Sequence, residues 1–150
     1  MTMAEPQFLV PGPNDDERPF WDGAARGELL VQTCAGCGSR RMPPRPMCPQ
    51  CRSLESTWEP TSGRGRIWSF VVAHPPLLPA YAELAPYNVI VVELEEDPTI
   101  RFVGNLVTGE DGPINEIDPA TIAVGELVQV VFQTVGEVTL PRWTRAGSPS

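Results

Sequence analysis

Five stretches in the second half of the chain are short, rich in β-branched and aromatic residues, and separated by turns and loops of unequal length. They cover residues 67–73, 89–95, 100–107, 127–134 and 138–143. Five short strands within about eighty residues predict a mainly β chain with a small closed or partly closed barrel. Gly104, inside the third stretch, predicts either a bulge or a close approach of another group to the backbone.

The first third of the chain carries different signals. Acidic residues 15–17 precede Pro19, an arrangement typical of a helix start, and Gly27 provides a stop, so we expect a short helix over residues 16–27. An apolar segment at Leu29–Gln32 predicts a strand, and residues 54–60 predict a second strand that returns beside it. Residues 1–14, with three prolines, are expected to form an extended arm.

Between those two strands, all four cysteines of the chain form two Cys-x-x-Cys pairs, Cys34/Cys37 and Cys48/Cys51. A two-residue gap lets both thiolates of one turn reach the same ion, and two such turns build the tetrahedral sulfur site that Zn²⁺ prefers. Two disulfides are the alternative, but paired spacing of this kind favours a shared metal. Four protein ligands leave no open position for water, which predicts a structural zinc. The spacing also permits iron, which would give a coloured protein.

Charge divides the chain into a basic and an acidic part. The formal net charge is −8, which argues against general binding to nucleic acids. All basic residues are arginines, and six of them lie between residues 34 and 66, whereas residues 83–126 hold ten acids and one arginine. The arginines either balance the negative charge of a thiolate site or form a local site for phosphate or carboxylate groups.

Residues suited to catalysis are few. The cysteines are assigned to the metal, and His74 is the only histidine. Glu93, Glu95, Glu96 and Asp97 cluster at a strand end, where solvated carboxylates are expected. The connection over residues 74–87 is unusually apolar, so it either covers its own barrel or presents a surface to a partner or an acyl chain. These features predict a binding module.

Neither a leader pattern at the start nor an apolar run of transmembrane length is visible in the sequence. Cysteines that bind a metal ion must stay reduced, which is typical of proteins in a reducing compartment. We therefore expect a cytoplasmic protein with no membrane contact.

Several segments in order, FWDGAARGELL, CAGCG, PPRPMCPQC, SGRGRIWSF, APYNVIVVELEE and a late LPRW, resemble the DUF35 family of zinc-ribbon/OB-fold proteins. The resemblance covers residues 20–143 and implies a helical arm, a rubredoxin-like zinc ribbon and a five-stranded OB-fold barrel. The expected domains are an arm and helix at 1–33, the ribbon at 34–62, the barrel at 63–145 and a disordered tail at 146–150. The family's four metal ligands fall on Cys34, Cys37, Cys48 and Cys51.

The resemblance also implies a function. Members of this family accompany thiolase-superfamily enzymes, including aldolases that shorten steroid side chains carried as CoA thioesters. The resemblance implies a non-catalytic subunit that binds acyl-CoA or acts as a scaffold, in a heterotetramer with a thiolase-like enzyme. Proteins of this family also occur beside hydratases of the MaoC type, so such a hydratase is a further possible partner. Arg64 and Arg66 are our candidates for the CoA phosphates, because an arginine binds a phosphate through two hydrogen bonds. Tyr81 and Tyr87 are candidates for contacting the acyl group or the partner.

Two other functions remain open from the sequence. Zinc ribbons and OB folds often bind nucleic acids, but such proteins need basic grooves with exposed aromatic residues, and the barrel half of this chain is acidic. A free-standing enzyme using Glu93 or His74 is the other alternative, and turnover of an acyl-CoA by the isolated chain would support it.

Overall fold

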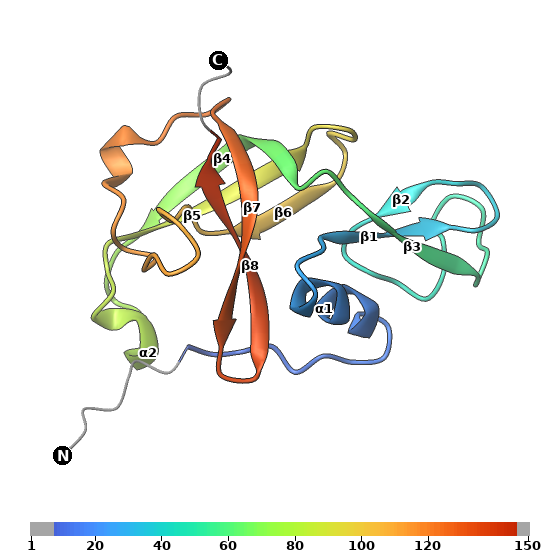
Figure 1. Ribbon diagram of the computed structural model, residues 1–150, viewed down its shortest axis with the longest axis horizontal. Coiled ribbons are helices and arrows are strands. Elements are labelled where there is room, and N and C mark those ends of the chain that lie inside the picture. The colour runs from blue at the N-terminus through green and yellow to red at the C-terminus, as the bar shows by residue number, and fades with distance from the viewer. Residues whose placement is uncertain (1–7, 147–150) are drawn as a thin grey trace.

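The computed structural model describes residues 8–146, which form two antiparallel sheets and two short α-helices (Figure 1). The predicted tail, apart from Ala146, and the first half of the predicted arm lie outside the described residues. The elements are α1 Arg18–Ala25, β1 Leu30–Cys34, β2 Arg40–Arg41, β3 Ser56–Pro60, β4 Arg64–Ala73, α2 Pro79–Ala82, β5 Tyr87–Leu94, β6 Arg101–Gly104, the 3₁₀ helix η1 Pro119–Thr121, β7 Leu127–Val135 and β8 Val138–Arg145. None of the described helices is of a length and hydropathy that would cross a membrane.

The smaller sheet is the ribbon, with strand order β2-β1-β3. Its central strand, β1, places Gln32 opposite Arg41 on one side and opposite Trp58 on the other. Both predicted ribbon strands are therefore present and antiparallel. The two cysteine turns lie at the end of this sheet away from the connection between β3 and β4 (Figure 1).

The larger sheet has the order β6-β5-β4-β7-β8 and curls into a near-closed barrel, as the five apolar stretches predict. A bulge between Ile67 and Ser69 shifts the register of β4 against β5. The two outer strands approach each other, but the only β-bridge between their ends in the described part is a parallel one that joins Leu106 to Trp143. The barrel therefore has a seam along β6 and β8.

The third predicted strand, 100–107, is shorter in the structure because β6 ends at Gly104. The indole of Trp143 lies there, with its Cδ1 only 3.1 Å from the position that a Cβ on Gly104 would occupy. This confirms the close approach predicted for this glycine. After it, the chain leaves the ladder with β5 and turns toward β8, where Leu106 meets Trp143.

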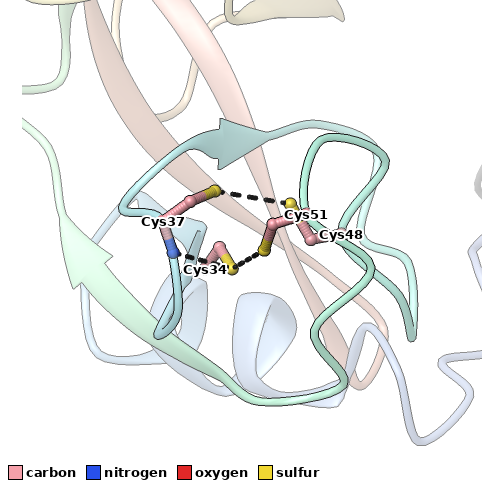
Figure 2. Close-up of side chains that lie close together, drawn as sticks. All are labelled: Cys34, Cys37, Cys48 and Cys51. Atoms are coloured by element: carbon pink, nitrogen blue, oxygen red, sulfur yellow. Dashed lines mark hydrogen bonds between the residues drawn. The ribbon is translucent and has the colours of Figure 1, made fainter.

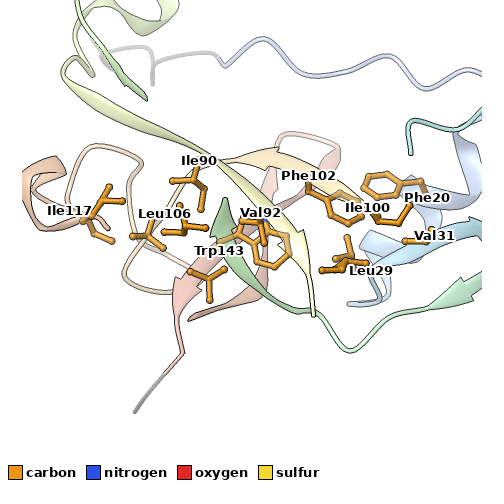
Figure 3. Packing of buried hydrophobic residues seen from close by; sticks show 14 residues of the cluster. Phe20, Leu29, Val31, Ile90, Val92, Ile100, Phe102, Leu106, Ile117 and Trp143 are labelled. Carbon is orange, nitrogen blue, oxygen red and sulfur yellow. The ribbon is translucent and has the colours of Figure 1, made fainter. Parts of the chain in front are cut away.

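One hydrophobic core joins all parts of the fold (Figure 3). Phe20 of α1 and Leu29 and Val31 of the ribbon pack in the same cluster as the interior residues of the barrel. The ring of Phe20 stacks on that of Phe102 from β6, with centroids 6.2 Å apart. Because arm, ribbon and barrel share this core, their boundaries remain a prediction from the sequence.

Polar contacts also tie the ribbon side to the barrel. Glu96, in the β5–β6 turn, accepts hydrogen bonds from the backbone N–H and the hydroxyl of Ser62, at 2.8 and 2.9 Å. Next to it, Asp97 pairs with Arg40 of β2 at 3.4 Å. Two of the four acids grouped at this strand end therefore hold the ribbon against the barrel.

Candidate metal centre and cavity

The four cysteine sulfurs meet at one end of the ribbon, all within 4.8 Å of one another. Figure 2 shows the two turns facing each other, with Cys34 Sγ 3.4 Å from Cys51 Sγ and Cys37 Sγ 3.7 Å from Cys48 Sγ. A zinc tetrahedron with bonds of about 2.3 Å has edges of about 3.8 Å, close to these distances. All four cysteines are free, and a disulfide would need about 2.05 Å between sulfurs. The geometry fits a metal ion rather than two disulfides.

The backbone around the sulfurs also fits a metal site. The N–H groups of Gly36 and Cys37 donate to Cys34 Sγ at 3.3 and 3.4 Å, and the N–H of Gln50 donates to Cys48 Sγ at 3.4 Å. Such bonds stabilise the thiolate form, which is the form that binds metal. The donor set and its surroundings therefore match a structural zinc.

Ser39 adds a contact that sequence reasoning missed. Its hydroxyl lies 3.3 Å from Cys48 Sγ and 3.1 Å from Cys37 Sγ. The hydrogen bond from Ser39, followed by backbone N–H groups, lowers the pKa of Cys48 to about 5. The pKa of Cys34 is also lowered, first by the backbone N–H of Cys37. Cys34 and Cys48 therefore deprotonate readily, and the resulting thiolates are the form that binds a metal ion.

The proline-rich loop between the two cysteine turns is fastened at Arg45. The side chain of Gln32 both donates to the carbonyl of Arg45, at 3.0 Å, and accepts from its N–H, at 2.9 Å. Arg41 donates to the same carbonyl through Nε and Nη2, at 3.2 and 2.8 Å. Both side chains are buried, so the loop that presents the second cysteine pair is held in place from the sheet.

A cavity of about 600 Å³ opens along the seam of the barrel. Its wall combines residues of the arm, α1, the ribbon loop, α2, β6 and β8, among them Phe8, Trp21, Met42, Phe102 and Leu140. Tyr81 and Tyr87 both line it, with ring centroids 6.0 Å apart. The apolar connection predicted to cover the barrel or to face a ligand thus reaches this cavity through its two tyrosines.

Arg142 is the buried cation on this wall, with 8% of its surface exposed. Burial lowers the pKa of Arg142, and the neighbouring Tyr81 partly opposes that shift. Its sequence context, inside the last strand, gave no signal that separated it from the exposed arginines.

The structure keeps Arg64 and Arg66 away from the cavity. Both are exposed at the start of β4, where Arg64 Nε lies 4.0 Å from Glu95 and Arg66 stands opposite Glu93. Tyr87 pairs with Ala73 at the other end of the same strand. Along β4, nine residues separate Arg64 from Ala73 and seven separate Arg66 from Ala73, which are roughly 30 Å and 23 Å of extended strand. The structure therefore does not place the two candidate arginines in the same site as the two candidate tyrosines.

Two family models match the chain. The model described as ChsH2, rubredoxin-like zinc ribbon domain, matches residues 21–56, and the one described as ChsH2, C-terminal OB-fold domain, matches residues 58–133. A DUF35 domain-containing scaffold protein of Methanothermobacter thermautotrophicus is 37% identical over 113 residues, which are 75% of this chain and 77% of that protein. The chain belongs to the DUF35 family. This confirms the resemblance seen in the sequence, as well as the ribbon and OB-fold class.

Other relatives of this DUF35 protein are subunits of enzymes. A probable enoyl-CoA hydratase alpha subunit of Thermomonospora curvata is 39% identical over 93% of this chain. A 3-oxo-4,17-pregnadiene-20-carboxyl-CoA hydratase alpha subunit of Mycobacterium tuberculosis is 35% identical over 91%. The chain spans only 41% and 40% of their lengths.

A solved structure described as Ltp2-ChsH2(DUF35) aldolase contains a similar chain. The match has a TM-score of 0.77 and 34% identity, and it covers 91% of this chain and 98% of the other. The DUF35 protein thus corresponds in fold to nearly the whole of that chain.

Proposed function

We propose that this protein is a non-catalytic subunit that binds a thiolase-superfamily enzyme, a thiolase or a steroid side-chain-CoA aldolase, and supports its action on acyl-CoA. The observation that carries the proposal is the similarity of 91% of this chain to 98% of a chain in a solved structure described as Ltp2-ChsH2(DUF35) aldolase. Zinc is the proposed structural metal, and the reduced cysteines favour the cytoplasm. We further propose a heterotetramer with the partner enzyme. A hydratase is the second candidate partner, favoured by the names of two relatives.

The outer face of β4, β5 and β6 is our candidate surface for the partner. Trp68, Val71 and Val103 are 47%, 62% and 72% exposed there. Val103 stands opposite Val91 in the sheet, and the guanidinium of Arg101 stacks on the Trp68 ring at 3.9 Å. Exposed apolar residues with a tryptophan and an arginine are the composition of interface hot spots.

The proposal keeps two separate candidate contacts for acyl-CoA. Arg64 and Arg66 are proposed for the phosphates, and Tyr81 and Tyr87 for the acyl group or the partner. Support for the tyrosines comes from their place on the cavity wall. Because roughly 23–30 Å of strand separates the two arginines from Ala73, the residue that pairs with Tyr87, each assignment needs its own test.

The test is co-purification of the tagged protein from its own host at high salt, followed by mass spectrometry. High salt removes weak electrostatic contacts. A thiolase-like chain at stoichiometric level is the expected result, and a hydratase would identify the second candidate. Recovery of no enzyme subunit would contradict the proposed function.

The surface is tested in the same assay with Val103→Glu and, as a matched control, Val124→Glu, because Val124 is 65% exposed in the loop before β7. A buried carboxylate at an interface is costly, so Val103→Glu is expected to lose the partner, whereas Val124→Glu retains it. Equal recovery with both variants would show that the partner binds elsewhere.

A further inference from the structure

The electrostatics of the cavity are unusual because its buried cation has only neutral hydrogen-bond partners among the described residues. Arg142 donates from Nε to Gln133 Oε1 at 3.1 Å, and from Nη1 to Asn105 Oδ1. No carboxylate of the described residues pairs with it. A buried charge without a counter-charge is costly, and Arg142, unlike the buried Arg41, lines a cavity that an anionic ligand can enter.

The two amides are themselves held so that they present oxygen to the arginine. The amide nitrogen of Asn105 donates to the carbonyl of Asn88, at 2.5 Å. The amide nitrogen of Gln133 donates to the carbonyl of Gly112, at 2.7 Å, and more weakly to that of Gly109. Arg142 is therefore fixed in direction, and its third nitrogen, Nη2, has no hydrogen bond within the described part of the chain. That nitrogen remains a donor on the cavity wall.

Tyr81 supplies a second donor beside Arg142. Its hydroxyl oxygen accepts the N–H of Leu9 at 3.2 Å, so the hydroxyl proton itself remains to be donated. Tyr81 and Arg142 line the same cavity. The rest of the wall is mainly aromatic and aliphatic, and the volume of about 600 Å³ lies within the range of small-molecule sites.

From this arrangement we infer that the seam cavity binds an apolar monocarboxylate, whose carboxylate meets Arg142 and Tyr81 and whose hydrocarbon body lies among the aromatic residues of the wall. The proposed function assigns Tyr81 and Tyr87 of the same cavity to the acyl group or the partner, so the inference rests on and deepens that function. Binding of a free acid by the isolated chain needs no partner enzyme, so the two proposals can fail separately. A free acid supplies this carboxylate, whereas a thioester of the same acyl group offers only a carbonyl oxygen in its place.

The test compares two probes of equal chain length, decanoate and 1-decanol, by calorimetry on the full chain. Tryptophan fluorescence provides a second readout, because Trp21 and Trp143 line the cavity. Decanoate is expected to bind about tenfold or more tightly than decanol, since a hydrogen bond to a charged group is worth more than one to a neutral group. Decanoyl-CoA, in a third titration, separates the free acid from the thioester.

Arg142→Gln is expected to remove the preference for decanoate and to leave the affinity for decanol unchanged. Arg26→Gln is the matched control, because Arg26 is exposed and forms a surface ion pair with Glu28. If Arg142→Gln fails to fold, the Nε–H signal of Arg142 in the wild type is followed by NMR, and it should shift with decanoate but not with decanol. Equal affinity for both probes, no binding of either, or full decanoate binding by Arg142→Gln would overturn the inference.

Discussion

Gly65 shows how a single residue type is dictated by its neighbours. A Cβ at this position would lie 2.3 Å from the carbonyl oxygen of Glu93 and 2.6 Å from Val92 Cγ1. The first of these atoms belongs to the backbone of the paired strand, which has no room to move away. The glycine in the SGRGRIW segment is therefore required by the packing of β4 against β5.

Gly65→Ala is expected to destabilise the protein by about 1–3 kcal/mol, because overpacking moves backbone out of place. The measurement is the midpoint of urea unfolding. Gly109→Ala serves as the control, since a Cβ there meets no atom within 4 Å. Equal midpoints for the two variants would mean that the backbone of β5 moves away from the added methyl group at little cost in free energy.

The buried polar residues mark the limit of prediction at this scale. Asn88 is fully buried and exchanges two hydrogen bonds with the backbone of Leu106, at 2.9 and 2.6 Å. In the sequence it precedes an apolar run and has no special signal. Its role depends on a segment 18 residues away that returns beside it, and no local pattern encodes that contact. The same reason hides Arg142 and Gln133.

At the scale of elements, local chemistry made the ribbon and the strands predictable. The cysteine spacing is complete within 18 residues, and each barrel strand is a continuous run of suitable residues. The seam cavity was not predictable, because its wall comes from eight separate segments that meet only after the strands have paired. The same holds for the distance between the candidate arginines and tyrosines, which follows from the register of β4 and β5.

Removing one ligand tests the metal centre. Cys48→Ser is expected to lose bound zinc and to lower the melting temperature by at least about 5 °C, since each kcal/mol shifts it by about 2–4 °C in a chain of this size. Strong chelation of the wild type should reproduce the effect. Ser39→Ala, which keeps all four thiolates, is expected to retain the metal. An unchanged melting curve for Cys48→Ser would show that the fold does not depend on the site.

Acid should loosen the contact between ribbon and barrel. Burial alone would raise the pKa of Glu96, but hydrogen bonds led by the Ser62 N–H outweigh it and lower that pKa. The pKa of Asp97 is lowered first by the Thr99 hydroxyl and further by Arg40. Since both pKa values lie below those of the unfolded chain, this stabilisation is present above about pH 4 and is lost as the pH falls through the folded values.

The double variant Glu96→Gln/Asp97→Asn is therefore expected to lose less stability than the wild type between pH 5 and pH 3, in urea unfolding at each pH. Both proteins keep the cysteine site, so acid release of the metal affects them alike. Glu110→Gln/Asp111→Asn, at two exposed acids, controls for net charge. A pH dependence identical to that of the wild type would exclude the two carboxylates as the source.

Considered as a whole molecule, the protein is acidic, and six of its eleven basic residues lie between residues 34 and 66. Arg64 and Arg66 stand at the junction of ribbon and barrel. Arg64 lies 4.0 Å from Glu95, and Arg66 stands opposite Glu93 on the neighbouring strand. Both lie at the surface, where an anion can reach them. Whether CoA phosphates bind there depends on the assembled complex, because the arginines are far from the cavity.

Arg64→Ala/Arg66→Ala is expected to weaken CoA-ester binding by the complex about tenfold, through the loss of charged hydrogen bonds to phosphate. Arg18→Ala/Arg26→Ala is the control, because both arginines are exposed and form surface ion pairs, with Asp15 and Glu28. Titration of both complexes with the same CoA ester provides the comparison. Equal affinities would remove Arg64 and Arg66 as phosphate contacts.

The shared core constrains how the parts of the protein can evolve. Phe20, Leu29 and Val31 fill the same interior as the barrel residues, so the ribbon and the barrel cannot change independently of each other. A chimera that joins a relative's ribbon to this barrel at residues 61–63 would combine two half-cores shaped for other neighbours. Recombination within the family should therefore preserve arm, ribbon and barrel together as one evolutionary unit, with substitutions at Phe20 matched by compensating changes at Phe102.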